Sequence, residues 1–196
     1  LKILKEKKVD YVFIPQTIEI YKKKRLKKII LKRSQKILCA KFRKGHFEGV
    51  LDVMNKLTKI INPQKIFMGE KDFQQLYLVK KKLEKKYKTK VIPCKTIRDR
   101  DNVALSSRNL LLNKSNLITA AKIYKTLVDI KKNTKNKKNI PSFLNLKKKE
   151  LKNNYKIKID YLELRNIKNL KLSNTKNNSR LFIAYYLKNV RLIDNL

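Results

Sequence analysis

Alternation between apolar and polar positions divides the chain into helix-like and strand-like segments. In residues 47–61, apolar side chains recur every three or four positions, the spacing of one face of a helix. The pattern predicts an amphipathic helix that ends before Pro63, because a proline disfavours helical backbone in the residue before it. The side chains expected to face the core are Phe47, Val50, Leu51, Met54, Leu57 and Ile61.

A strand, a helix and a second strand follow over residues 65–97. The apolar run KIFM (65–68) predicts a buried strand, Gly69 a turn, and residues 72–87 a second amphipathic helix. Residues 90–97 (KVIPCKTI) predict the next strand. A β-α-β unit implies two parallel strands joined by a right-handed crossover. The apolar face of this helix carries Phe73, Leu76, Val79 and Leu83.

The remaining segments predict a smaller α+β part beside this α/β part. Near the start, the apolar run at residues 9–14, stopped by Pro15, predicts another buried strand. We expect a parallel α/β domain over residues 1–97 and an α+β domain over residues 98–196. Within the second domain the pattern predicts a helix over 114–131, a flexible Asn/Lys linker over 131–139, a helix opened by Pro141, and strands near 157–164 and 180–193.

The candidate chemistry lies where the two predicted parallel strands end, because open parallel sheets bind ligands there. Gly69 begins the segment GEKDFQQ (69–75) and allows a ligand to approach the backbone. Asp72 is placed to cap the helix, and Lys71 adds positive charge to N–H groups that already favour an anion. Gln75 lies one turn after Lys71, so both side chains can face one cleft. The alternative is a plain strand-to-helix turn with a capping Asp.

Two further clusters carry polar side chains. Residues 105–109 (LSSRN) place two hydroxyls beside Arg108, which suits phosphate oxygens and equally suits a helix cap. The second predicted strand returns the chain to the same sheet edge, so this loop and residues 69–75 can meet one ligand. His46, in RKGHF (43–47), is the only histidine, and a lone histidine is more often structural than catalytic. A Ser-His-Asp triad and a histidine-based metal cluster are therefore unsupported.

Charge is the main anomaly of the composition. The chain has 52 Lys and Arg residues against 15 Asp and Glu, a net charge of +37, which suggests a nucleic acid or an anionic membrane as partner. Only nine of the basic residues are arginines, whereas nucleic-acid readers favour the arginine fork. The excess of Lys, Asn and Ile is typical of an AT-rich genome. We favour that explanation over selected polyanion binding, and a solvated face or loop over a polyanion patch for the basic run at 22–36.

Cysteine content and hydropathy fit a protein of the reducing cytoplasm. Cys39 and Cys94 show no C-x-x-C spacing, so neither a disulfide framework nor a zinc site is suggested. No apolar run approaches the roughly 20 residues that span a bilayer. No secretory signal pattern opens the sequence. We therefore expect a cytoplasmic protein with no membrane partner.

Together the clusters resemble the pantothenate synthetase family, the pantoate–β-alanine ligases. The resemblance implies a partial Rossmann-like nucleotidyltransferase domain and a smaller C-terminal domain that covers the ATP site, usually in a homodimer. It also implies a two-step reaction. ATP and (R)-pantoate form pantoyl adenylate and pyrophosphate, and the amine of β-alanine then releases AMP and pantothenate. The matching segments are KGHFEGV (44–50), GEKDFQQL (69–76), ALSSRN (104–109) and RLIDN (191–195), with weaker likeness in VDYVFIP (9–15).

The resemblance assigns roles to individual residues. Lys71 and Arg108 would be catalytic through the phosphates, and Gln75 would bind pantoate. Arg43 and His46 resemble a segment beside the pantoate pocket. Mg²⁺ would accompany the triphosphate without a direct protein ligand. The ATP site would comprise Gly69 and Asp72 at the ribose, Lys71 at phosphate, the Ile97 backbone at adenine, Ser106, Ser107 and Arg108 at the triphosphate, and the adjoining Glu70 and Leu105.

The sequence departs from the family pattern in several places. Lys44 replaces the usual proline, and Asn102 replaces a glycine, a mild change because Asn tolerates left-handed backbone. The family's first βα loop carries an H-x-G-H-like motif for the ATP phosphates, which a chain with His46 alone does not contain. A further substrate-binding glutamine would lie upstream of Leu1. We expect an N-terminally incomplete chain that lacks roughly 60 residues or more and is inactive alone. The alternative is a non-catalytic polyanion-binding module derived from the same fold.

Overall fold

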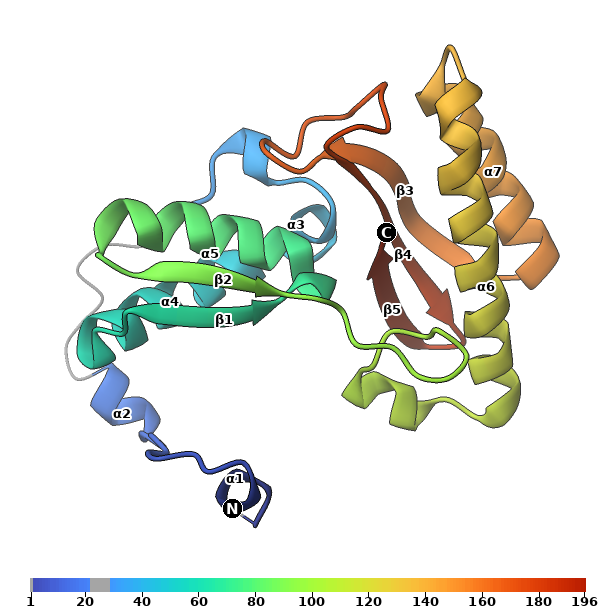
Figure 1. Cartoon of the computed structure of the whole chain (residues 1–196). Coiled ribbons are helices and arrows are strands. Elements are labelled where there is room, and N and C mark those ends of the chain that lie inside the picture. Colours follow the sequence, from blue (N-terminus) through green and yellow to red (C-terminus); the bar gives the residue numbers. More distant parts are fainter. Residues whose placement is uncertain (1, 22–28) are drawn as a thin grey trace.

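A computed structural model describes residues 2–21 and 29–196 and places two parts side by side (Figure 1). The N-terminal part comprises α1 (Lys2–Glu6), α2 (Thr17–Ile20), the 3₁₀ turn η1 (Arg33–Gln35), α3 (Cys39–Phe42), α4 (His46–Ile61), β1 (Lys65–Gly69), the 3₁₀ turn η2 (Glu70–Asp72), α5 (Phe73–Lys86) and β2 (Lys90–Cys94). The C-terminal part comprises η3 (Ser107–Leu111), α6 (Lys114–Asn133), η4 (Thr134–Asn136), α7 (Ile140–Tyr155), β3 (Lys158–Asn166), β4 (Ser179–Leu187) and β5 (Val190–Asn195).

The predicted β-α-β unit is confirmed. Strands β1 and β2 pair in parallel, with Lys65 opposite Lys90 and Gly69 opposite Cys94. Helix α5 connects them and packs on the sheet through Leu76, Val79 and Leu83, all buried. Strand β2 ends three residues earlier than expected, and residues 95–97 lead out towards the C-terminal part. The carboxyl ends of both strands therefore lie at one edge, as the sequence predicts.

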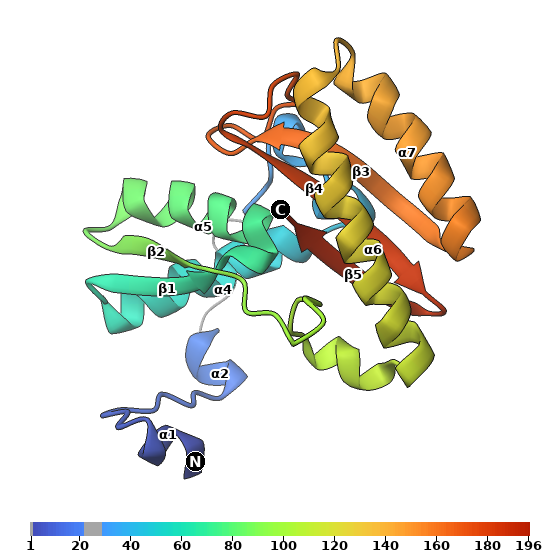
Figure 2. The same cartoon turned by 45° about the vertical axis from the view of Figure 1, so that its right-hand side comes forward.

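The C-terminal part is an antiparallel sheet in the order β3-β4-β5, covered on one face by α6 and α7 (Figure 2). Side chains on that face, such as Leu164 and Ile183, join the two helices in one core cluster. Side chains on the other face, including Tyr161 and Phe182, belong to a second cluster shared with α3, α4 and α5. The sheet is thus buried on both faces, and β5 contacts η2, the turn that follows β1.

Sequence patterns also predict the long helices correctly. Helices α4 and α6 begin and end within two residues of their expected limits, and α7 begins one residue before Pro141, as expected. Asn113 and Asn139 cap α6 and α7, each accepting a hydrogen bond from the backbone N–H three residues later. In residues 2–21 and 29–196, we find no helix with the length and apolar character needed to span a membrane.

The strand expected at residues 9–14 is absent. This segment is extended between α1 and α2 but pairs with no strand, and its apolar side chains are largely exposed, with Tyr11 at 92% and Ile14 at 77%. An apolar run becomes a strand only where a neighbour takes up its backbone hydrogen bonds, and none of the described residues offers one. The expected core residue Ile61, the last of α4, is also exposed.

Two further expectations are wrong in the C-terminal part. The Asn/Lys run at 131–139 is mostly helical, because α6 continues to Asn133 and η4 follows. Thr134 anchors it: the side chain is buried and its hydroxyl donates to the Lys131 carbonyl. The segment at 180–193 is two strands, since Lys188 adopts a left-handed conformation and turns the chain. Residues 22–28 of the basic run lie outside the described residues.

Candidate active site

Lys71 joins the two loops that the sequence predicts to meet. It lies in η2, directly after β1, and its Nζ donates to the carbonyls of Leu105 at 2.8 Å and Ala104 at 3.4 Å. Burial lowers the pKa of Lys71, an effect that Asp72 and Asp194 partly oppose. The amine is therefore half-buried, with its position fixed by the neighbouring loop.

The loop over residues 98–109 is held by charged side chains. Arg98 pairs with Asp194 of β5 through two hydrogen bonds of 2.7 and 2.8 Å and lies over the ring of Tyr124. Asn102 adopts a left-handed conformation with φ of 66°. Asparagine tolerates this conformation, which explains how it can stand where the family has a glycine. The Asp99 carboxylate accepts from the Val103 N–H. This loop is consequently fastened to β5 before any ligand binds.

Ser106 and Arg108 face the same region. The Ser106 hydroxyl caps η3 by accepting from the Arg108 N–H at 3.2 Å, so the helix-cap interpretation of this cluster is correct for that side chain. The Arg108 guanidinium donates to the Arg191 carbonyl on β5 at 2.8 Å. Ser107 is exposed and lines neither cavity described below. Arg108 is thus positioned by the backbone of the C-terminal sheet.

A cavity of about 190 Å³ lies between these groups. Its polar lining is mainly cationic, and Asp72 is its single carboxylate. Burial lowers the pKa of Arg43, and the nearby Arg108 lowers it further, which shows that the positive charges repel one another. Converging cations with few counter-charges favour a polyanion with several oxygens. The cationic side chains are Arg43, Lys71, Arg108 and Arg191.

A second, smaller cavity of about 30 Å³ adjoins the first and shares Arg43, Lys71 and Asp72 with it. It brings Gln75 of α5 together with His46, which begins α4. Burial lowers the pKa of His46, and the charge of Arg43 lowers it further. The structure therefore gathers the three residues that resemble a pantoate pocket.

Other expected site residues lie apart from both cavities. The side chains of Ile97 and Leu105 are more than half exposed, and the Ile97 carbonyl accepts from the Leu105 N–H at 3.0 Å. The Glu70 carboxylate turns away to pair with Arg180 at 2.9 Å. Asp72, by contrast, lines both cavities. It stands at the N-terminus of α5, but its side chain makes no capping hydrogen bond, so the expected helix cap is wrong.

Gly69 has ordinary extended backbone with φ of −67°, so its backbone conformation does not require glycine. A Cβ built there meets nothing within 4 Å. The protein's own packing does not require glycine either, and the position is open to a ligand's approach.

Sequence reasoning missed Arg191 and Asn195 as site residues. Arg191 lines the larger cavity while its Nε donates to Asp160 at 2.9 Å. Asn195 is buried and bonds to the backbone of η2. Both belong to the RLIDN segment, and the arginine was the available signal, because arginine is rare among the basic residues of this chain.

The fold and the cavity define a class: an α/β protein with a cationic cavity where its parallel strands end, the arrangement of proteins that bind phosphate groups. The chain belongs to the pantoate-beta-alanine ligase family, whose model matches residues 1–196.

Named relatives agree with this assignment. The pantothenate synthetase of Flavobacterium psychrophilum is 38% identical over 162 residues, covering 80% of this chain and 56% of that protein. The pantothenate synthetase of Caldicellulosiruptor bescii is 32% identical, covering 100% of this chain and 71% of that protein. The chain thus spans between about half and three quarters of the length of these curated relatives.

Solved structures give the same result. The pantothenate synthetase of Thermus thermophilus superposes with a TM-score of 0.88 at 27% identity, covering 100% of this chain and 72% of that one. The pantoate-beta-alanine ligase of Francisella tularensis, complexed with beta-gamma ATP and beta-alanine, has a TM-score of 0.76 at 34% identity, covering 100% and 67%. The parallel unit and the antiparallel three-stranded sheet are therefore those of this family.

Proposed function

We propose that this chain contributes its site residues to the ligase that joins (R)-pantoate to β-alanine with ATP, through a pantoyl adenylate. The observation that carries the proposal is the cavity of about 190 Å³ with four basic side chains, adjoined by the cavity that contains Gln75 and His46. Membership of the ligase family supports it. So does the Francisella relative, whose structure is named as a complex with an ATP compound and β-alanine.

In the first step, a carboxylate oxygen of pantoate attacks the α-phosphorus of ATP. The bond from that phosphorus to the bridging oxygen breaks, and pyrophosphate leaves with the electron pair. Lys71 and Arg108 stabilise the charge that accumulates on the phosphate oxygens, and Arg43 and Arg191 add to the same field. A Mg²⁺ ion bound with ATP would be held through the phosphates and would supply further positive charge to them. In the described part of the chain, no three metal-binding side chains gather.

In the second step, the neutral amine of β-alanine attacks the acyl carbon of the adenylate. AMP leaves with the electrons of the carbon–oxygen bond, and the amine loses a proton to solvent. The mixed anhydride makes this attack possible, because AMP is a far better leaving group than the oxygen of a free carboxylate. Gln75 orients pantoate from α5, beside His46 and Arg43. Holding the two reactants in line supplies much of the acceleration.

The remaining assignments belong to the same proposal. Gly69 and Asp72 hold the ribose, the Ile97 backbone faces adenine, and Ser106 and Ser107 bind the triphosphate. Glu70 and Leu105 contribute through their backbone, since the Glu70 carboxylate is paired and the Leu105 carbonyl accepts from Lys71. A homodimer, a cytoplasmic location and a domain boundary near residue 97 stay predictions. Sedimentation, cell fractionation and limited proteolysis test them in turn.

Replacing Lys71 tests the proposal. In the full-length gene product, pyrophosphate release from ATP should require pantoate, and K71A should slow it about a hundredfold, because one preorganised donor stabilises the transition state by about 3 kcal/mol. K125A, at an exposed lysine of α6, is the matched control and should retain the wild-type rate. Pantoate-independent or absent pyrophosphate release contradicts the ligase. An unchanged rate in K71A removes Lys71 from the mechanism.

A further inference from the structure

The last residue of β5, Asn195, hydrogen-bonds to the turn that carries Lys71. Asn195 is 4% exposed, and its amide nitrogen donates to two successive carbonyls, those of Glu70 and Lys71, both at 2.9 Å. Its Oδ1 accepts from Arg180 of β4 at 2.7 Å. Both amide hydrogens and the amide oxygen are therefore engaged, and the two donated bonds fix the amide's orientation.

Arg180, on the neighbouring strand β4, also contacts this turn. Its guanidinium pairs with the Glu70 carboxylate at 2.9 Å and lies over the ring of Phe73, 4.7 Å from the centroid. The turn η2 has little support of its own, because Asp72 makes no capping bond. Side chains from β4 and β5 therefore hold η2 from outside, through two carbonyls and one carboxylate.

These hydrogen bonds also orient the peptide groups of η2. In a trans peptide the carbonyl and the following N–H point opposite ways. With the Glu70 and Lys71 carbonyls directed at Asn195, the N–H groups of Lys71 and Asp72 point away from it. Lys71 and Asp72 both line the larger cavity. Asn195 therefore determines which side of η2 faces the larger cavity.

We propose that Asn195 is a positioning residue for Lys71. It transmits the placement of the C-terminal sheet to the amine that meets phosphate. Asn195 also lines the smaller cavity, but its amide group is bonded to Glu70, Lys71 and Arg180. Only the expected effect of Asn195 on the reaction rate depends on the proposed ligase function. The geometric claim, that Asn195 fixes the Lys71 side chain, stands independently of the reaction.

The geometric claim is tested on the 196-residue chain by the rate at which N-hydroxysuccinimidyl acetate acetylates Lys71, read by mass spectrometry. N195A should raise that rate severalfold, because the freed turn exposes a half-buried amine. The matched control is N55A, which removes an asparagine bonded to Lys86 and Tyr87 at the far end of α5. N55A should leave Lys71 acetylation unchanged. No change in N195A, or an equal rise in both variants, overturns the proposal.

R180K covers the case in which N195A does not fold. Lysine keeps the charge beside Glu70 but loses the planar fork that reaches Asn195. Lys71 acetylation in R180K should rise above the wild-type rate, and an unchanged rate overturns the proposal.

Kinetics of the full-length gene product separate this proposal from the ligase function. N195A should lower kcat for pyrophosphate release about tenfold with a smaller change in the KM for pantoate. In a K71A background the same substitution should cost much less, because Asn195 acts through Lys71. An undiminished loss in that background overturns the positioning role. If the wild-type protein releases no pyrophosphate, the ligase proposal fails, while the acetylation result still decides the geometry.

Discussion

His46 is the one imidazole of the chain, and its surroundings oppose a positive charge. Burial lowers its pKa below 6.5, and Arg43 lowers it further, so the ring is neutral at pH 7. In the unfolded chain His46 has its ordinary pKa and so binds more protons than in the folded protein at acidic pH. His46 therefore lowers the free energy of unfolding as pH falls below 6.5. A neutral ring also avoids repelling the cations beside it.

A single imidazole makes this measurable by proton NMR. The His46 ring signal should titrate with a midpoint below 6.5, and R43Q should move that midpoint upward by removing a like charge. R33Q, at an exposed arginine of η1, is the control and should leave the midpoint unchanged. A wild-type midpoint at or above 6.5 contradicts the described environment.

Some of the basic site residues could be predicted from the sequence and others could not. Lys71 and Arg108 were predictable, because each follows a strand in a polar loop. Arg191 lies inside a strand, and only the pairing of β5 with β4 and its bond to Asp160 place it at the cavity. In this lysine-rich chain, Arg98 and Arg180 stand where the planar guanidinium makes two polar contacts at once.

Helix α4 contains or adjoins two glycines that should respond to alanine in opposite ways. Gly45, the residue before the helix, has φ of 77°, a left-handed conformation that strains any other residue except asparagine. Gly49 lies inside the helix, and a Cβ there meets nothing within 4 Å. G45A should therefore lower the free energy of unfolding by about 1 kcal/mol. G49A should raise it by up to about 1 kcal/mol.

Urea denaturation of the two variants tests this pair, each serving as the control for the other. Changes of the same sign would contradict the backbone assigned to the start of α4. Because His46 and Arg43 flank Gly45, G45A should also weaken pantoate binding, whereas G49A should leave it intact.

Elements with their own periodicity were predictable, and those that depend on partners were not. Helices α4, α5, α6 and α7 bury a continuous apolar stripe, which the sequence shows directly. Residues 9–14 look like a strand but pair with none in the described chain. Residues 131–136 look like a linker, yet Thr134 packs into the C-terminal part and keeps the chain helical. Neither outcome follows from local sequence, because both depend on tertiary neighbours.

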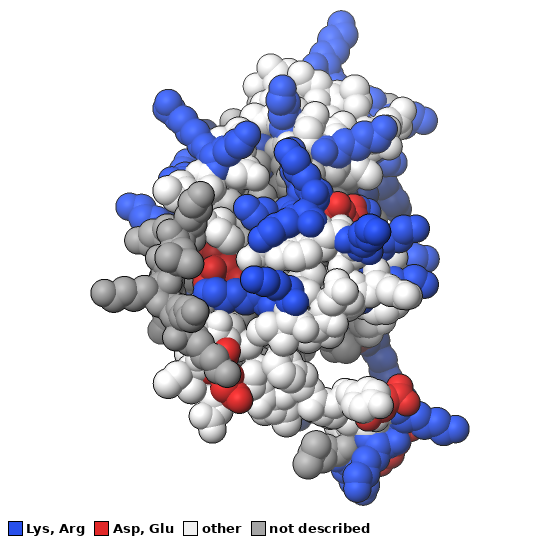
Figure 3. All heavy atoms as spheres, turned by 90° about the vertical axis from the view of Figure 1, so that its left-hand side faces the viewer, with Lys and Arg blue, Asp and Glu red and all other residues white. Residues whose placement is uncertain are grey.

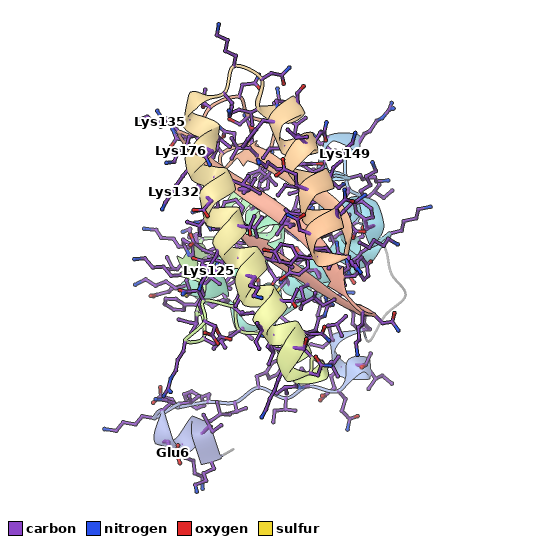
Figure 4. The ribbon with its side chains drawn as sticks, turned by 90° about the vertical axis from the view of Figure 1, so that its right-hand side faces the viewer. Glu6, Lys125, Lys132, Lys135, Lys149 and Lys176 are labelled. Carbon is purple, nitrogen blue, oxygen red and sulfur yellow. The ribbon has the colours of Figure 1, made fainter. Side chains whose placement is uncertain are left out.

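The charge of +37 belongs to the surface of the whole molecule. Lys and Arg stand out from most of the face in Figure 3, with few Asp and Glu among them. Figure 4 labels four exposed lysines of this part: Lys125 and Lys132 on α6, Lys135 on η4, which follows α6, and Lys149 on α7. These lysines lie on the helices that cover the outer face of the antiparallel sheet, so the substrate chemistry does not require them.

Such a surface should make stability depend on salt. Raising NaCl from about 20 to about 200 mM should raise the melting temperature, because salt screens repulsion between like charges. Equal osmolarity of sucrose separates screening from solvent exclusion. A melting temperature that falls with NaCl would contradict net repulsion and indicate that ion pairs dominate.

Binding to random duplex DNA distinguishes the polyanion-binding alternative. Several phosphate contacts would give a log–log salt slope of about −0.9 for each phosphate. A steep slope at physiological salt, without pantoate-dependent pyrophosphate release, would favour that alternative over the ligase.

Transfer of an oxygen isotope from pantoate to AMP tests whether the reaction passes through pantoyl adenylate. The full-length gene product is incubated with ATP, β-alanine and pantoate whose carboxylate carries ¹⁸O. An adenylate route leaves one carboxylate oxygen on the α-phosphorus, so we expect AMP that contains one ¹⁸O atom. Unlabelled AMP, or ADP with the label in inorganic phosphate, would contradict it.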